Sequence, residues 1–189
     1  MAGPVAEILL RHPTSTDEAF DLVVSAGQAL VLTAQAPRPE EAHAVATVPL
    51  PNGHDFGIWL VPTNHERDLD EATLVARSAG YRPSAGLQVV SWTRNAATAR
   101  LQAELLIELA TADDEVLIEL AGPITPPGFR RTDDLGSSME AVRRYVDGRP
   151  GLIREVAYSL AVGGTWIYHL VDSRFLRAWL QDPDFHLPN

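Results

Sequence analysis

Short apolar runs of strand length alternate along this chain with longer segments in which apolar residues recur at helical spacing. Strand-like runs in the first half cover residues 5–11, 44–50, 56–61 and 87–94. A mixture of single strands, strand pairs and helices is typical of a sheet with helices packed against it. The pattern therefore predicts an α+β fold, with a mixed, largely antiparallel sheet and helices packed on one face.

The first 94 residues predict six elements in the order strand, helix, strand, strand, helix, strand. Thr14, Ser15 and Thr16 precede two acids and mark the start of the first helix. The second helix covers residues 70–79 and ends at Gly80, which has the position that a C-cap favours. This is the order of ferredoxin-like folds, so a ferredoxin-like first half is one arrangement that the sequence allows.

The second half continues the alternation of strands and helices. Asn95 is a candidate cap for a helix that reaches about Ala110, and a strand follows at 115–121. Residues 122–136 read as a proline-rich, flexible loop and precede a helix at 137–146. A length of 189 residues suits one domain, so we expect a single domain over 1–189, with 1–94 and 95–189 as sub-halves.

The closing segment, residues 163–189, is unusually rich in aromatic residues for a chain terminus. Two strands, 153–161 and 165–171, are expected to form a hairpin at Gly163-Gly164. Asp172 or Ser173 caps a final helix. Its apolar residues share one face at helical spacing: Phe175, Leu176, Trp179 and Leu180. This pattern predicts an element that closes the core rather than a free tail.

Composition excludes several classes of chemistry. The chain has no cysteine, so disulfides, thiolate nucleophiles and cysteine zinc sites are ruled out. All 15 basic residues are arginine, a bias typical of a GC-rich genome, and a P-loop lysine is therefore impossible. No apolar run has the length of a membrane span, and no signal peptide is recognised at the start. We expect a cytoplasmic protein without a cofactor.

The net charge of −10 is the main indication of a partner. It disfavours nucleic acid, which needs a basic surface, and favours a basic protein. The acidic turn Asp113, Asp114 and Glu115 is the first candidate contact. Trp179 and Phe185 are further candidates on the condition that their side chains are exposed.

Polar residues offer two other kinds of site. The pairs His54-Asp55 and His65-Glu66 carry metal-binding atoms, but a strand separates them, so we expect loop residues and no metal site. A second hypothesis places a pocket near His169, Tyr168 and the arginine doublets 130–131 and 143–144. No catalytic residue can be assigned from these patterns.

The sequence also carries a resemblance. The end of the chain resembles the ends of an uncharacterised family of small soluble bacterial proteins, a domain of unknown function. The resemblance lies in a strand followed by Asp172, Phe-Leu-Arg-Ala-Trp-Leu and Asp-Pro. Residues 87–122 resemble the same family. Such proteins are similar in build to immunity proteins that neutralise a toxin. The resemblance implies a non-enzymatic, immunity- or antitoxin-like domain that binds a basic protein. The alternatives are a small-molecule-binding domain or enzyme with its pocket near His169, and a structural subunit of a homo-oligomer such as a homodimer.

Overall fold

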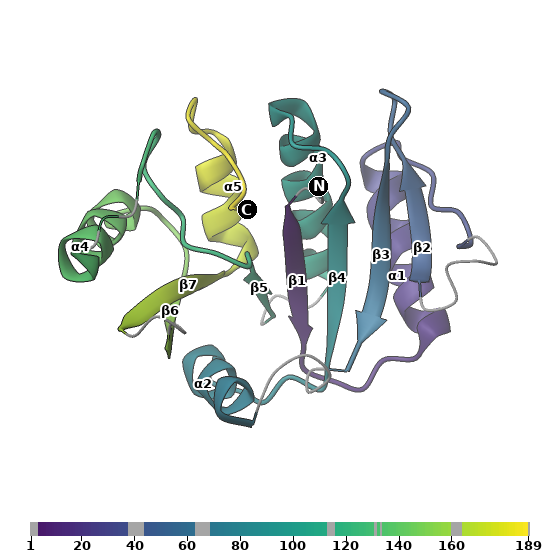
Figure 1. Ribbon diagram of the computed structural model, residues 1–189. Helices are drawn as coiled ribbons and strands as arrows, with labels where there is room; N and C mark the ends of the chain where they lie inside the picture. Colours follow the sequence, from purple (N-terminus) through teal and green to yellow (C-terminus); the bar gives the residue numbers. More distant parts are fainter. Residues whose placement is uncertain are drawn as a thin grey trace.

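Seven antiparallel strands form one sheet in the computed structural model (Figure 1). The structure describes residues 4–37, 44–62, 69–112, 116–130, 132, 134–159 and 164–188. The strands are β1 (Val5–Leu10), β2 (Ala44–Pro49), β3 (Asp55–Val61), β4 (Ala85–Ser91), β5 (Leu117–Glu119), β6 (Ile153–Ser159) and β7 (Thr165–Val171). Their order across the sheet is β2-β3-β4-β1-β5-β7-β6, so strands from both halves of the chain share one sheet.

Five helices pack against this sheet. They are α1 (Thr16–Ala29), α2 (Leu69–Ala79), α3 (Ala96–Thr111), α4 (Leu135–Val146) and α5 (Ser173–Leu180). The α+β class and the antiparallel sheet predicted from the sequence are confirmed. No described helix combines the length and the apolar character needed to span a membrane.

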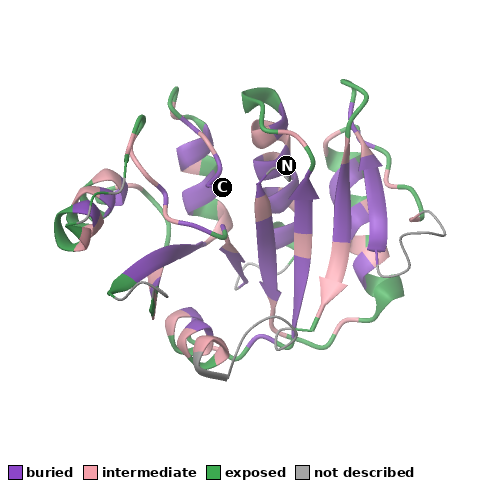
Figure 2. Ribbon diagram, in the orientation of Figure 1, coloured by how far each residue is buried: buried purple, intermediate pink, exposed green. Residues whose placement is uncertain are grey.

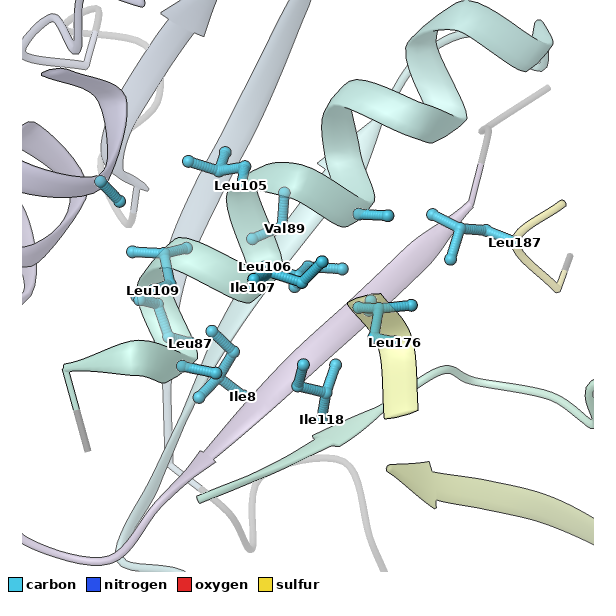
Figure 3. Close-up of a cluster of buried hydrophobic side chains, with 14 of the residues drawn as sticks. Ile8, Leu87, Val89, Leu105, Leu106, Ile107, Leu109, Ile118, Leu176 and Leu187 are labelled. Carbon is cyan, nitrogen blue, oxygen red and sulfur yellow. The ribbon is translucent and has the colours of Figure 1, made fainter. Parts of the chain in front are cut away.

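Helix α3 lies at the centre of the larger hydrophobic core, between α1 and α5 (Figure 1). Figure 3 shows its side chains Leu105, Leu106 and Leu109 close to Leu87 and Val89 of β4. Half of its 16 residues are buried, because the sheet and two neighbouring helices surround it. A helix apolar on most of its circumference is stable in water only with such cover.

The sheet is apolar on both faces along β1, so helices are needed to cover both faces. Ile8 joins the core under α3, whereas the next residue, Leu9, joins a second cluster on the opposite face. Val75 and Ala79 of α2 pack in that second cluster. Helix α2 therefore covers the face that the other helices leave free, and the expectation that all helices share one face does not hold for α2.

The strand order also shows that the first half does not have a ferredoxin-like arrangement. The six elements follow in the expected order, but β4 lies between β1 and β3 and is antiparallel to both. Strands β1 and β2 consequently run in opposite directions, whereas a split βαβ unit needs them parallel. Element order alone does not determine which strands pair.

Local start and stop signals are confirmed. The Ser15 hydroxyl accepts the Glu18 N–H, and the Glu18 carboxylate accepts the Ser15 N–H, which completes a capping box on α1. Asn95 caps α3 by accepting the Thr98 N–H at 2.8 Å, and Asp172 caps α5 by accepting the Phe175 N–H at 2.7 Å. Each cap satisfies a backbone donor that would otherwise lack a partner.

The closing helix completes the core, as the sequence predicts. Phe175, Leu176, Trp179 and Leu180 are all buried. Arg100 of α3 donates to the carbonyls of Leu180 and Asp182 at 2.7 and 3.1 Å, where α5 ends. A guanidinium in this position satisfies carbonyls that have no partner within the helix.

Replacing Trp179 by alanine should lower the free energy of unfolding by about 4 kcal/mol, because it leaves a large cavity in a buried cluster. Urea denaturation followed by circular dichroism measures this change. Arg177→Ala, on the exposed side of the same helix, is the matched control and should change stability by less than about 0.5 kcal/mol. Equal effects of the two substitutions would show that α5 is not part of the core.

Candidate functional site

Two of the contact residues expected from the sequence, Trp179 and Phe185, are buried in the structure. Trp179 is 0% exposed and Phe185 is 6% exposed, so the condition on which they were candidates is not met. Their rings meet edge-on with centroids 4.8 Å apart, so both side chains contribute to the core. Asp113, Asp114 and Glu115 lie outside the described residues.

An uncovered part of the sheet offers a different surface. Among the described residues, no helix covers β2, β3 and β4 on the face opposite α1 and α3 (Figure 1). Six residues on this side, from β3, β4 and the position just beyond β4, form what we call the tryptophan face: Asp55, Gly57, Trp59, Gln88, Val90 and Trp92. Trp92 is exposed, and Asp55, Trp59 and Gln88 are partly exposed.

Two tryptophans dominate the tryptophan face. Trp92 is 51% exposed, and its ring meets that of Trp59 edge-on, with centroids 6.1 Å apart and an interplanar angle of 87°. Trp59 lies flat over Gly57, and a Cβ at position 57 would overlap its ring. Because Gly57 has no side chain, the Trp59 indole can lie against the sheet, and in that position its ring contacts the ring of Trp92.

Polar side chains continue in a row from the tryptophan face across the sheet. Trp59 lies opposite Gln88, Gln88 opposite Glu7, and Glu7 opposite Glu119. The Gln88 amide donates to the Glu7 carboxylate at 3.2 Å, and this carboxylate lies over Gly86. This packing leaves only 7% of Glu7 exposed.

His169 lies on the other face of the sheet and is 0% exposed. Its Nδ1 accepts the Ile124 N–H at 2.8 Å, so the proton of the neutral ring sits on Nε2. No hydrogen-bond acceptor meets Nε2 in the structure. Burial lowers the pKa of His169 from 6.5 to about 4, and the ring is neutral at physiological pH. A buried N–H without a partner costs about 1–3 kcal/mol.

The structure divides the residues that the sequence grouped around His169. Tyr168 points to the opposite face, because successive strand residues alternate, and its hydroxyl lies 3.4 Å from Glu71. Arg143 does lie near His169, bound to the cross-strand neighbour Glu155. The loop after β5 is anchored rather than free at its start, since Ile124 is buried and bonded to the histidine.

Metal-binding atoms are not gathered in the part of the chain that the structure describes. Within those ranges, no group of three or more His, Asp and Glu side chains is placed to hold a metal ion. His54 and Asp55 are described at the start of β3, whereas His65 and Glu66 lie outside the described residues. The interactions that the described side chains make are therefore hydrogen bonds, aromatic contacts and ion pairs.

Comparison with known proteins places the chain in a family. The sequence profile of a family of unknown function, DUF6368, matches residues 2–189. The chain belongs to this family. No curated protein and no solved structure matches the chain. The match agrees with the resemblance to an uncharacterised family seen in the sequence and assigns no activity to this DUF6368 member.

The tryptophan face was missed in the sequence, although one signal for it is present. Gly57 and Trp59 are two residues apart in a strand and therefore share a face, and glycine in a strand often marks a close approach. The contact with Trp92 depends on the pairing of β3 with β4, which the sequence does not reveal.

Replacing Gly57 by alanine should lift the Trp59 ring from the sheet and separate it from Trp92. We expect a shift of tryptophan fluorescence to longer wavelength and a loss of about 1–3 kcal/mol of stability from overpacking. The matched control is Gly136→Ala, where the new Cβ meets only Asp134 Oδ1, at 3.4 Å. Unchanged emission of the Gly57→Ala variant would contradict the flat placement of Trp59.

His169 should make the protein less stable in mild acid. Its pKa is about 4 in the folded chain and near the ordinary 6.5 when unfolded, so the unfolded state binds the extra proton between these values. Stability contributed by the neutral ring is therefore present above pH 6.5 and falls as pH drops towards 4, by up to about 1.4 kcal/mol per pH unit. Urea denaturation across this range should give a steeper pH dependence for the natural chain than for His169→Leu. Parallel curves would show that His169 is not held neutral by burial.

Proposed function

We propose that this DUF6368 protein is a non-enzymatic, cytoplasmic binding domain that recognises a basic protein, as an immunity protein or antitoxin does. The observation that carries the proposal is the half-exposed Trp92, packed edge-on against Trp59 on a sheet half without a covering helix. Tryptophan is enriched among the residues that dominate protein interfaces, and it is rarely left exposed in monomeric proteins.

Rigidity favours this surface as a binding site. Trp59 is fixed by the contact over Gly57, and Trp92 is fixed by Trp59. Side chains that are already held in place lose little conformational entropy when a partner binds. The tryptophan face therefore offers apolar area at a low entropic cost.

Charge favours a basic partner. The chain carries a net charge of −10, which attracts a basic protein over a distance. An arginine or lysine side chain can stack on an indole ring while a carboxylate neutralises it. The same charge opposes face-to-face association of two copies of this chain, so a basic protein is favoured over a homodimer.

Calorimetry with the protein encoded by the neighbouring gene tests the proposal. Trp92→Ala should weaken binding by about 2 kcal/mol, or about thirtyfold, because it removes the central aromatic contact. Affinity should also fall as salt rises, since charge contributes to it. The matched control is Val31→Ala, which shortens another exposed apolar side chain, 93% exposed, beyond the C-terminus of α1.

Two outcomes would contradict the proposal. Equal affinities of Trp92→Ala and Val31→Ala would remove the tryptophan face from the interface. A stable dimer of the chain alone in sedimentation equilibrium, dissociated by Trp92→Ala, would show instead that a second copy occupies this face.

A further inference from the structure

A cleft separates the C-terminal half of α4 from the start of β6. It has a volume of about 400 Å³, and its walls include three guanidinium groups, those of Arg143, Arg144 and Arg149. Glu140, Asp147 and Glu155 also line it. Glu155 pairs with Arg143 and Glu140 with Arg144, and the three arginines match the three acids of the lining in number, within a chain of net charge −10.

The pair Arg143–Glu155 is the central contact of the cleft. Nε of Arg143 donates to both carboxylate oxygens, at 2.9 and 3.1 Å, and Nη2 donates to one of them at 2.8 Å. The two side chains are 47% and 32% exposed, so water and solutes reach them. An exposed pair of this kind opens at little cost, and the fork of Arg143 suits any planar or tetrahedral oxyanion.

A second potential donor to the Glu155 carboxylate is His169, on the neighbouring strand β7. Glu155 lies directly opposite His169 in the β6–β7 pair. Their backbones do not bond to each other. The Glu155 carbonyl accepts the Ser78 hydroxyl, and the N–H and carbonyl of His169 bond to Gly122 and Leu120. In such a non-hydrogen-bonded pair the side chains stand closest together.

His169 carries a buried donor that lacks a partner in this arrangement. Among the described residues no acceptor bonds its Nε2–H, although the carboxylate of its cross-strand neighbour Glu155 is one. Arg143 binds that carboxylate in the structure. If another anion took the place of Glu155 on Arg143, the freed carboxylate could accept the Nε2–H, and this donor would be satisfied.

We propose that the α4–β6 cleft binds a small ligand through an oxyanion, a phosphate or a carboxylate, that replaces Glu155 on Arg143 and transfers Glu155 to the Nε2–H of His169. The exchange keeps one anion on Arg143 and adds one hydrogen bond inside the protein. Arg144 lines the same cleft, is 73% exposed, and can supply further N–H donors to the ligand, whereas Arg149 is held by Asp182 at 2.7 Å. This site is independent of the tryptophan face, which lies on the other side of the sheet.

Nuclear magnetic resonance of the ¹⁵N-labelled histidine rings follows the exchange directly. We expect inorganic phosphate or a small dicarboxylate, added at constant ionic strength, to move the His169 Nε2–H resonance downfield in a saturable way. Whichever of the two saturates at lower concentration identifies the class of oxyanion. Arg143→Ala should show the downfield position without ligand, because Glu155 is already free, and should not respond to either anion.

Two further variants keep the test decisive. Glu155→Gln should bind the anion more tightly, since no carboxylate competes for Arg143, and its His169 resonance should move less. Arg130→Ala removes an exposed arginine outside the cleft lining and should behave as the natural chain does. The proposal is overturned if neither anion produces a saturable change. It is also overturned if backbone signals of the cleft shift while the His169 Nε2–H stays unchanged, which would indicate an adventitious ion only.

Discussion

The packing of α3 on the middle of the sheet is the contact on which the rest of the structure depends. Gln102 of this helix is fully buried, and its amide donates to the carbonyl of Pro4 before β1, at 3.1 Å, and to that of Val89 in β4, at 2.9 Å. One side chain thus joins the helix to the two central strands. Helices α1 and α5 lie beside α3, and no helix in the described part of the chain covers the opposite face of β2, β3 and β4. Figure 2 shows that β1 and β4 are nevertheless buried along most of their length. Side chains that lie flat on the sheet, Trp59 over Gly57 and Glu7 over Gly86, account for part of this cover.

The sequence predicted what depends on local interactions. Helix and strand positions follow from spacing, and the caps Ser15, Asn95 and Asp172 act within three residues of themselves. Strand order could not be predicted in the same way, because β4 inserts between β1 and β3 through pairings across many residues. The position of α2 follows from the second apolar face of β1, which the run around Leu9 permits but does not require. The burial of Trp179 and Phe185 could not be predicted for a related reason. Aromatic content does not distinguish a buried Trp179 from an exposed Trp92, since both residues are equally apolar and only packing separates them.

The two faces of the sheet carry different chemistry. On the half of the face that α2 leaves uncovered, Trp92 packs edge-on against Trp59, and this aromatic area is the basis of the immunity-like role that we propose. On the helix-bearing side, His169 keeps an unpaired N–H beneath an exchangeable ion pair, an arrangement suited to a small oxyanion. Both features violate a rule of stable packing, one by exposing tryptophan and the other by burying an unsatisfied donor. Such departures are expected at functional positions, where stability is given up for binding.

Hydrogen–deuterium exchange of the chain in complex with the basic protein that we propose as its partner tests the central claim most directly. If the helix-free half of the sheet is the binding surface, peptides spanning residues 55–62 and 85–93 should exchange more slowly in the complex, while those of α1, on the covered side, should be unchanged. Protection confined to α1 or α4, with β3 and β4 unaffected, would contradict the assignment of the tryptophan face.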